Sequence, residues 1–212
     1  FAADILSRVD EDASDEARTV LFDVKCSISL AETITKHGGI PKMMRTGHSF
    51  QKLALREAPD TPMAGEMSGH FFFNDRWPGF DDSLYCIARM LELVAREPAP
   101  GRGGRTFSDR LAEIPTYPSS GEPKGRRVGG RVEVMRFVGE SYDDFGMGTV
   151  DGFRINFQND EWEGWYLCRP SNTEPILVMR AEATTEDGLA AIRAEVQSRI
   201  GLRIDLTKFD EA

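Results

Sequence analysis

Short apolar runs and amphipathic stretches alternate along the first half of the chain. The apolar runs that predict strands span residues 19–24, 40–44 and 62–64. After the first run, a helix is expected to begin at Ser29, with Glu32 as its capping-box partner, and to end near Gly38. A second helix is expected over residues 49–56. Strands that alternate with helices in this order predict an α/β domain with a parallel sheet and right-handed crossovers.

A longer amphipathic helix is predicted farther along. Its apolar residues recur at helical spacing and are expected to face the core: Leu84, Ile87, Leu91 and Val94. The run Phe71-Phe72-Phe73 is predicted to be core rather than a platform on which a sugar ring stacks. We expect this first domain to cover residues 1–118.

The second half follows residues 98–130, a segment rich in proline, glycine and arginine that is expected to contain the linker between two domains. Beyond it, strands are predicted at residues 131–138, 153–157, 164–168 and 176–180. A closing helix is expected to be capped by Thr184 with Asp187. Its predicted buried face comprises Leu189, Ile192, Val196 and Ile200. The pattern predicts a small α+β domain over residues 119–212.

Composition narrows the choice of partners. The chain has 212 residues, 40% of them hydrophobic, with a formal net charge of −9. This charge argues against nucleic acid or an anionic membrane surface as the main partner. No stretch approaches the roughly 20 apolar residues of a membrane span. The cysteines, Cys26, Cys86 and Cys168, are odd in number and far apart, which fits a reducing cytoplasm better than a disulfide framework.

The turn after the predicted strand 164–168 carries side chains suited to phosphate. Its residues Arg169, Ser171, Asn172 and Thr173 offer a guanidinium fork, two hydroxyls and an amide. Backbone N–H groups in such a turn can also form a concave nest for an anion. The alternative interpretation is a polar turn with a surface arginine.

A second motif, Gly65-Glu66-Met67-Ser68-Gly69-His70, combines a carboxylate and a hydroxyl. In an extended segment Glu66 and Ser68 share a face and can hold two neighbouring hydroxyls of a sugar ring. Lys25, His48 and Glu66 each follow a predicted strand of the parallel sheet. We therefore expect them to meet at its carboxyl edge, where open α/β sheets bind ligands.

Two further motifs, Phe22-Asp23-Val24-Lys25-Cys26 and Arg45-Thr46-Gly47-His48-Ser49, complete a set of four in one order. With them, the chain resembles the C-terminal half, domains three and four, of the α-D-phosphohexomutase family, in its bacterial phosphomannomutase/phosphoglucomutase branch. The resemblance implies that Lys25 and His48 are catalytic, as acid, base or charges that stabilise the transferring phosphoryl group. Arg45 would orient phosphate or support its loop, and His70 would bind the sugar or anchor the turn.

The resemblance also implies a reaction, the reversible transfer of a phosphoryl group between O1 and O6 of a hexose phosphate. The transfer passes through a phosphoserine and a hexose 1,6-bisphosphate intermediate. The substrates would be mannose or glucose 1- and 6-phosphate, with Mg²⁺ and the bisphosphate activator as cofactors. The loop Arg169, Ser171, Asn172 and Thr173 would hold the non-reacting phosphate. Glu66 and Ser68 would hold O3 and O4, so that mannose and glucose are both accepted.

Two family loops are missing from this sequence: the serine loop and the metal loop. Both are expected in N-terminal mutase domains preceding Phe1, so the chain alone is predicted to be inactive. Residues 119–127 also depart from the family pattern, which puts the first strand and helix of the second domain in doubt. Two alternatives remain open: a mutase acting on an amino or N-acetylated hexose, and a noncatalytic phosphosugar-binding protein.

Overall fold

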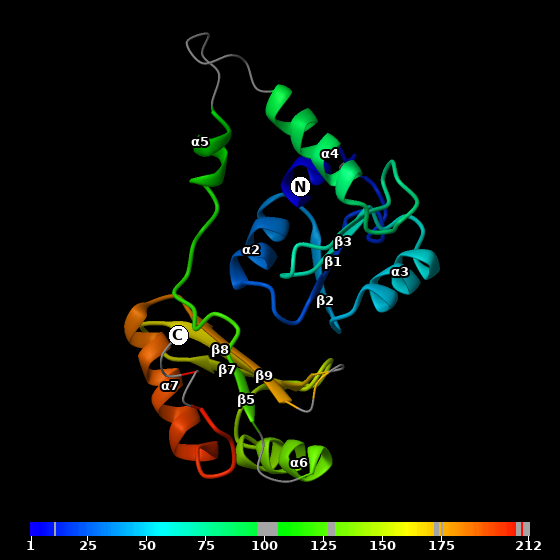
Figure 1. Cartoon of the computed structure of the whole chain (residues 1–212). Coiled ribbons are helices and arrows are strands. Elements are labelled where there is room, and N and C mark those ends of the chain that lie inside the picture. Colours follow the sequence, from blue (N-terminus) through cyan, green and yellow to red (C-terminus); the bar gives the residue numbers. More distant parts are fainter. Residues whose placement is uncertain are drawn as a thin grey trace. The chain divides into compact units, whose positions relative to one another are not determined.

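The computed structural model describes residues 1–10, 12–96, 106–126, 130–171, 174, 176–206 and 209. The chain forms two compact units, Phe1–Thr116 and Tyr117–Ala212 (Figure 1). Of the predicted linker, residues 98–105 and 127–129 lie outside the described part, and the short helix α5 (Phe107–Leu111) lies between these gaps.

Unit 1 is built on a four-stranded sheet with the order β2-β1-β3-β4. The strands β1 (Thr19–Asp23), β2 (Ile40–Met44) and β3 (Met63–Gly65) are parallel, as predicted. The fourth strand, β4 (Phe71–Phe73), was not predicted and runs antiparallel to β3. Its Phe72 and Phe73 are buried, which confirms that this aromatic run belongs to the core.

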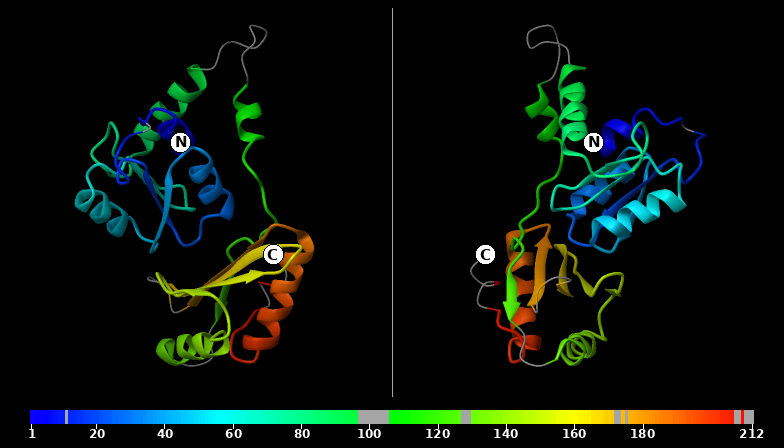
Figure 2. Two further views of the ribbon diagram at one scale, coloured as in Figure 1. Left: turned by 180° about the vertical axis from the view of Figure 1, so that it is seen from behind. Right: turned by 45° about the vertical axis from the view of Figure 1, so that its right-hand side comes forward.

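Helices cover both faces of this sheet (Figures 1 and 2). On one face, α1 (Ala2–Leu6) and α2 (Ile28–Lys36) share a core with β1 residues such as Val20 and Phe22. On the other face, Leu55 of α3 (His48–Glu57) packs with Leu21, which lies between Val20 and Phe22 in β1 and therefore points to the opposite face of the sheet.

The cap of α2 differs from the predicted one. Ser27, rather than Ser29, is the N-cap, and its hydroxyl oxygen accepts a hydrogen bond from the Ser29 N–H at 3.1 Å. The helix ends as predicted before Gly38, whose φ of +75° favours glycine.

The long helix α4 (Ser83–Ala95) forms, but the prediction of its buried face is wrong. The predicted stripe is exposed: Leu84 77%, Ile87 56%, Leu91 63% and Val94 43%. The helix instead buries Arg89 and Leu93. The Arg89 guanidinium bonds to Asp75 at 2.7 Å and lies 4.5 Å from the centre of the Phe73 ring, so a paired charge takes the position expected for an apolar residue.

Unit 2 is an antiparallel sheet with the order β5-β9-β8-β7-β6. Its strands are β5 (Lys124–Arg126), β6 (Met147–Gly148), β7 (Phe153–Gln158), β8 (Glu163–Pro170) and β9 (Ile176–Ala183). Two helices, α6 (Arg131–Ser141) and α7 (Glu186–Ile200), pack with one face of the sheet in a single core. The two units confirm the predicted fold class, a parallel-sheet α/β domain followed by a small α+β domain.

Two local predictions in unit 2 are wrong. Residues 131–138, predicted as a strand, belong to α6, because Val134, Val138 and Tyr142 are buried at a spacing of four residues. The cap of α7 is Thr185 rather than Thr184, with its hydroxyl accepting from the Gly188 N–H at 3.0 Å. The predicted buried face of α7 is confirmed at all four positions.

Candidate functional site

The loops that follow β1, β2 and β3 are joined by hydrogen bonds at the carboxyl edge of the sheet in unit 1. The carboxylate of Asp23 accepts from the Thr46 hydroxyl at 2.9 Å and from the Met67 N–H at 3.3 Å. The Gly47 N–H donates to Glu66 Oε1 at 2.7 Å. These contacts confirm that the three loops meet, because parallel strands deliver their carboxyl ends to one edge.

Glu66 is buried and holds its neighbours with both oxygens. Oε1 accepts from Gly47, and Oε2 accepts from the hydroxyl of Ser68 at 3.2 Å. Ser68 itself is exposed. The pair therefore presents a carboxylate and a hydroxyl side by side, the arrangement predicted for two neighbouring sugar hydroxyls.

Lys25 is also buried, two residues beyond the end of β1. Its ammonium lies 3.8 Å from Asp23 Oδ2, and the Asp23 side chain has no exposed surface. A buried ammonium beside a buried carboxylate is held in one place, which suits a charge that must stabilise a developing anion.

The loop after β2 is more exposed. His48 begins α3 with an exposed side chain, so its imidazole is open to a ligand. Arg45 is exposed as well, and its guanidinium lies 3.8 Å from the centre of the Phe50 ring. This stacking contact fixes the direction of the arginine and fits support of the loop.

His70 is held by a carboxylate that the sequence analysis missed. Its Nδ1 lies 3.0 Å from Asp81 Oδ2, and the Lys52 ammonium donates to Asp81 Oδ1 at 3.2 Å. Burial works to raise the pKa of Asp81, but the hydrogen bonds from Lys52 and His70 outweigh it and lower that pKa. His70 is thereby anchored through one ring nitrogen.

In unit 2, Arg169 lies near the end of β8 rather than in the turn itself. Its guanidinium is buried, and Nε donates to Asp151 Oδ2 at 2.9 Å. Its Nη2 is buried and has no hydrogen-bond partner within the described part of the chain. A buried guanidinium with a donor to spare suits an anionic ligand, because an unmatched buried donor is costly.

A glycine turn holds Asp151 against Arg169. Gly152 has a φ of +78°, and a Cβ placed there would lie 2.5 Å from the Cys168 carbonyl oxygen and 2.6 Å from Arg169 Cβ. Only glycine allows this approach. The sequence offers a signal for it, since Asp-Gly ahead of a strand is typical of a tight turn.

The remaining residues of the predicted phosphate loop are described in part. The Ser171 N–H donates to the Ile176 carbonyl at 3.0 Å, and its hydroxyl accepts from the Glu174 N–H at 3.2 Å. Asn172 and Thr173 lie outside the described residues. Ser171 thus begins a tight turn between β8 and β9, as the sequence predicts.

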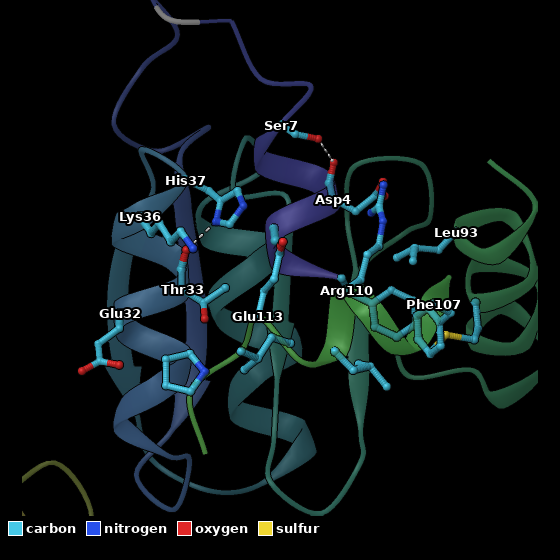
Figure 3. Close-up of a pocket in the computed structure, with 16 residues that line it drawn as sticks. Asp4, Ser7, Glu32, Thr33, Lys36, His37, Leu93, Phe107, Arg110 and Glu113 are labelled. Carbon is cyan, nitrogen blue, oxygen red and sulfur yellow. Dashed lines mark hydrogen bonds between the residues drawn. The ribbon is translucent and has the colours of Figure 1, made fainter. Parts of the chain in front are cut away.

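Unit 1 also contains a pocket of about 560 Å³, whose lining residues are drawn in Figure 3. It is lined by residues of α1, α2, α4 and α5 and by the segment after α5. Asp4, Glu32 and Glu113 share it with Lys36, His37 and Arg110, so its lining carries charge of both signs (Figure 3). It includes none of the predicted site residues.

Among the residues that the structure describes, no three His, Cys, Asp or Glu side chains gather as a metal site. No helix in the same part of the chain is long and apolar enough to cross a membrane. In that part of the chain, the side chains do not form a magnesium site.

Two family models match the sequence. The model "Phosphoglucomutase/phosphomannomutase, alpha/beta/alpha domain III" matches residues 1–117, and the model "Phosphoglucomutase/phosphomannomutase, C-terminal domain" matches residues 145–198. Residues 118–144, between the matches, include the segment in which the sequence departs from the family pattern.

Curated relatives agree with these matches. A phosphomannomutase/phosphoglucomutase of Pseudomonas syringae pv. tomato is 36% identical over an alignment of 200 residues, and the match covers 91% of this chain and 38% of the relative. A phosphoglucomutase of Neisseria gonorrhoeae is 38% identical over an alignment of 198 residues, and this match covers 91% of this chain and 39% of the relative.

A solved structure extends the agreement to the fold. The crystal structure of a phosphoglucomutase/phosphomannomutase family protein from Burkholderia thailandensis matches with a TM-score of 0.77 and 36% identity, covering 95% of this chain and 40% of that one. The chain spans about two-fifths of the length of the relatives it matches. It belongs to the phosphoglucomutase/phosphomannomutase family of α-D-phosphohexomutases, of which it carries the third and C-terminal domains.

Proposed function

We propose that this chain supplies the sugar-binding and phosphate-binding parts of a phosphomannomutase/phosphoglucomutase. The whole enzyme would move a phosphoryl group reversibly between O1 and O6 of a hexose phosphate, through a phosphoserine and a hexose 1,6-bisphosphate. The observation that carries the proposal is the joining of three motif loops at one sheet edge, with Lys25 and Glu66 buried there.

The sugar would be held by the loop after β3. Glu66 Oε2 and the Ser68 hydroxyl are 3.2 Å apart, a spacing at which both can contact neighbouring hydroxyls of one ring. Contacts to O3 and O4 do not distinguish the configuration at C2, where mannose and glucose differ, so both sugars would be substrates. His70 would add a further sugar contact, directed by its bond to Asp81.

The phosphate groups would meet the cationic side chains. Arg169 and Ser171, with Asn172 and Thr173, would bind the phosphate that does not react, and Arg169 Nη2, which has no acceptor among the described residues, would donate to it. Lys25 would stabilise charge on the transferring group, and His48 would act as acid or base. Arg45 would orient the phosphate or support its loop.

The nucleophilic serine and the metal ligands would come from N-terminal mutase domains. Mg²⁺, when bound in the whole enzyme, would neutralise phosphate charge, and hexose 1,6-bisphosphate would act as the activator. The proposed setting is the cytoplasm. Alone, the chain would bind hexose phosphates without converting them.

Phosphorus NMR tests the proposal. Mannose 1-phosphate is incubated with the chain, Mg²⁺ and glucose 1,6-bisphosphate, and its resonance is followed with time. We expect broadening or a shift without formation of mannose 6-phosphate, and we expect Arg169→Ala to abolish the change. The matched control is Arg136→Ala, since Arg136 is an exposed arginine of the same unit.

Two outcomes contradict the proposal in different ways. Formation of mannose 6-phosphate by the chain alone would show that the missing serine and metal loops are not required. A resonance that responds equally in the wild type and in Arg169→Ala would show that Arg169 does not bind the phosphate.

A further inference from the structure

The carboxylate of Asp23 is the point at which the loops of the unit 1 site are joined. Asp23 is the last residue of β1, the strand between β2 and β3, and it is fully buried. Its carboxylate contacts residues in the loops after all three parallel strands. The sequence motifs predict no role for it.

Its oxygen Oδ1 gathers donors from two loops. It accepts from the Lys25 N–H at 3.3 Å and the Cys26 thiol at 3.2 Å, both in the loop after β1. It also accepts from the Met67 N–H at 3.3 Å, in the sugar-binding motif 44 residues away in sequence. One oxygen thus sets the distance between the lysine loop and the loop of Glu66 and Ser68.

Its other oxygen, Oδ2, contacts the loop after β2 and the lysine side chain. It accepts from the Thr46 hydroxyl at 2.9 Å, in the loop that carries Arg45 and His48. The Lys25 ammonium lies 3.8 Å from the same oxygen. The negative charge therefore holds the lysine side chain, while the hydrogen bonds hold the loops.

Burial makes this arrangement rigid. A carboxylate without exposed surface must be neutralised and hydrogen-bonded, and Lys25 is the cation that the structure places beside it. If the carboxylate lost its charge, the ammonium would lose the attraction of this buried anion.

We propose that Asp23 is a positioning residue of the site, which orients the Lys25 ammonium and sets the spacing of the loops that carry His48 and Glu66. This inference rests on the proposed function for its consequence in substrate binding. Asp23 is buried beneath the loops and acts through them.

Two variants separate its charge from its hydrogen bonds. Asp23→Asn keeps an acceptor oxygen for the Met67 and Lys25 N–H groups but removes the negative charge. Thr46→Val, nearly equal in shape, removes one donor to Oδ2 and leaves the ion pair intact. Amide ¹H–¹⁵N spectra of the whole chain report the loops, with amides of α7 as an internal control.

In the amide spectra we expect Asp23→Asn to shift the Met67, Lys25 and Gly47 signals and to leave those of α7 in place. In binding, we expect its dissociation constant for mannose 1-phosphate to rise at least tenfold, on the scale of a lost buried charge contact. Its dissociation constant for inorganic phosphate, which has no sugar, should change less than about twofold. Thr46→Val should shift the Gly47 and His48 amides and weaken mannose 1-phosphate binding about threefold.

Each result decides the matter. Unchanged loop amides in Asp23→Asn, or equal weakening for mannose 1-phosphate and inorganic phosphate, would overturn the positioning role. If Asp23→Asn does not fold, Thr46→Val is the test. Unchanged amide signals of Gly47 and His48 in that variant would overturn the positioning role. If the wild type binds neither ligand, the proposed function fails, while the loop shifts still judge the role of Asp23.

Discussion

The two units hold their candidate binding groups by different means. In unit 1, buried carboxylates reach across the sheet edge to loops distant in sequence, as Asp23 does to Met67 and Glu66 does to Gly47. In unit 2, Arg169 near the end of β8 packs closely against Gly152, and the turn at this glycine places Asp151 within hydrogen-bond distance of the arginine. Charge and hydrogen bonds organise the first region, and backbone shape organises the second.

This difference predicts which substitutions each region tolerates. In unit 1, a loop can relax by small movements when one hydrogen bond is lost, so single changes should alter binding more than folding. In unit 2, the contact distances leave no room for an added atom, so a single methyl group should disturb the fold itself. The predictions below test that contrast.

The largest effect is expected from Gly152→Ala in unit 2. The new methyl group would lie 2.5 Å from a carbonyl oxygen, at a φ of +78° that alanine rarely adopts. Overpacking and backbone strain together should lower the free energy of unfolding by about 3–4 kcal/mol. Urea unfolding, followed by hydrogen exchange of amides in each unit, measures the loss.

Gly121→Ala is the matched control. Gly121 also has a positive φ, +67°, but a Cβ there would meet nothing within 4 Å. It should cost only the conformational term, about 1 kcal/mol. If both variants lost the same stability, crowding at Arg169 would not be what distinguishes unit 2.

The next largest effect is expected in the core of unit 1, where a substitution should change stability without disturbing the site loops. Leu93→Ala removes a buried side chain of α4 and should cost about 2–3 kcal/mol. Leu91→Ala, on the exposed face of the same helix, should change stability by less than about 0.5 kcal/mol. Chemical denaturation measures both, and the amides of Gly47 and Met67 should stay in place. Equal losses of stability in Leu93→Ala and Leu91→Ala would contradict the exposure of Leu91 on α4.

How far the sequence predicts this molecule depends on the range of the interactions involved. The strands of unit 1 and the convergence of its loops follow from local apolar runs and from one rule about parallel sheets. Likewise, the buried face of α7 follows from helical periodicity. These features need no knowledge of a distant partner.

Most of the missed features depend on such a partner, whereas the caps of α2 and α7 differ only by a local choice between nearby hydroxyl residues. Leu and Ile at helical spacing predict a buried stripe on α4, but the pairing of Arg89 with Asp75 buries the opposite face. Residues 131–138 alternate like a strand, and only the packing of Val134 and Val138 against the sheet identifies a helix. The acids Asp23, Asp81 and Asp151 each contact a residue well separated in the sequence, which no local pattern reveals.

A smaller effect is expected from Glu66→Gln in unit 1. The amide keeps an acceptor for the Gly47 N–H but loses the charge that strengthens this 2.7 Å bond. We expect a loss of about 1 kcal/mol, with the Gly47 amide signal moving upfield. Urea unfolding and an amide spectrum measure the two quantities. Glu57→Gln, an exposed carboxylate at the end of α3, is the control and should change neither.

The smallest effect concerns Asp81 and depends on pH. Its pKa is lowered in the folded chain because the bonds from Lys52 and His70 outweigh burial, whereas an unfolded aspartate titrates near about 3.9. A carboxyl whose pKa is lower in the folded state stabilises the fold above its unfolded pKa, and the contribution is lost as the pH falls through the folded pKa. Asp81→Asn should therefore reduce stability at about pH 7, by less than about 1 kcal/mol because the pair is partly exposed.

Lowering the pH completes this test. The difference between the wild type and Asp81→Asn should shrink steadily as urea unfolding is repeated from about pH 5 down to about pH 3. A difference that stayed constant would assign the loss to shape rather than charge. In that case carboxylate charge would hold the loops bonded to Asp23 and Glu66 but not His70. The contrast between the two units would then apply only to the buried carboxylates of unit 1.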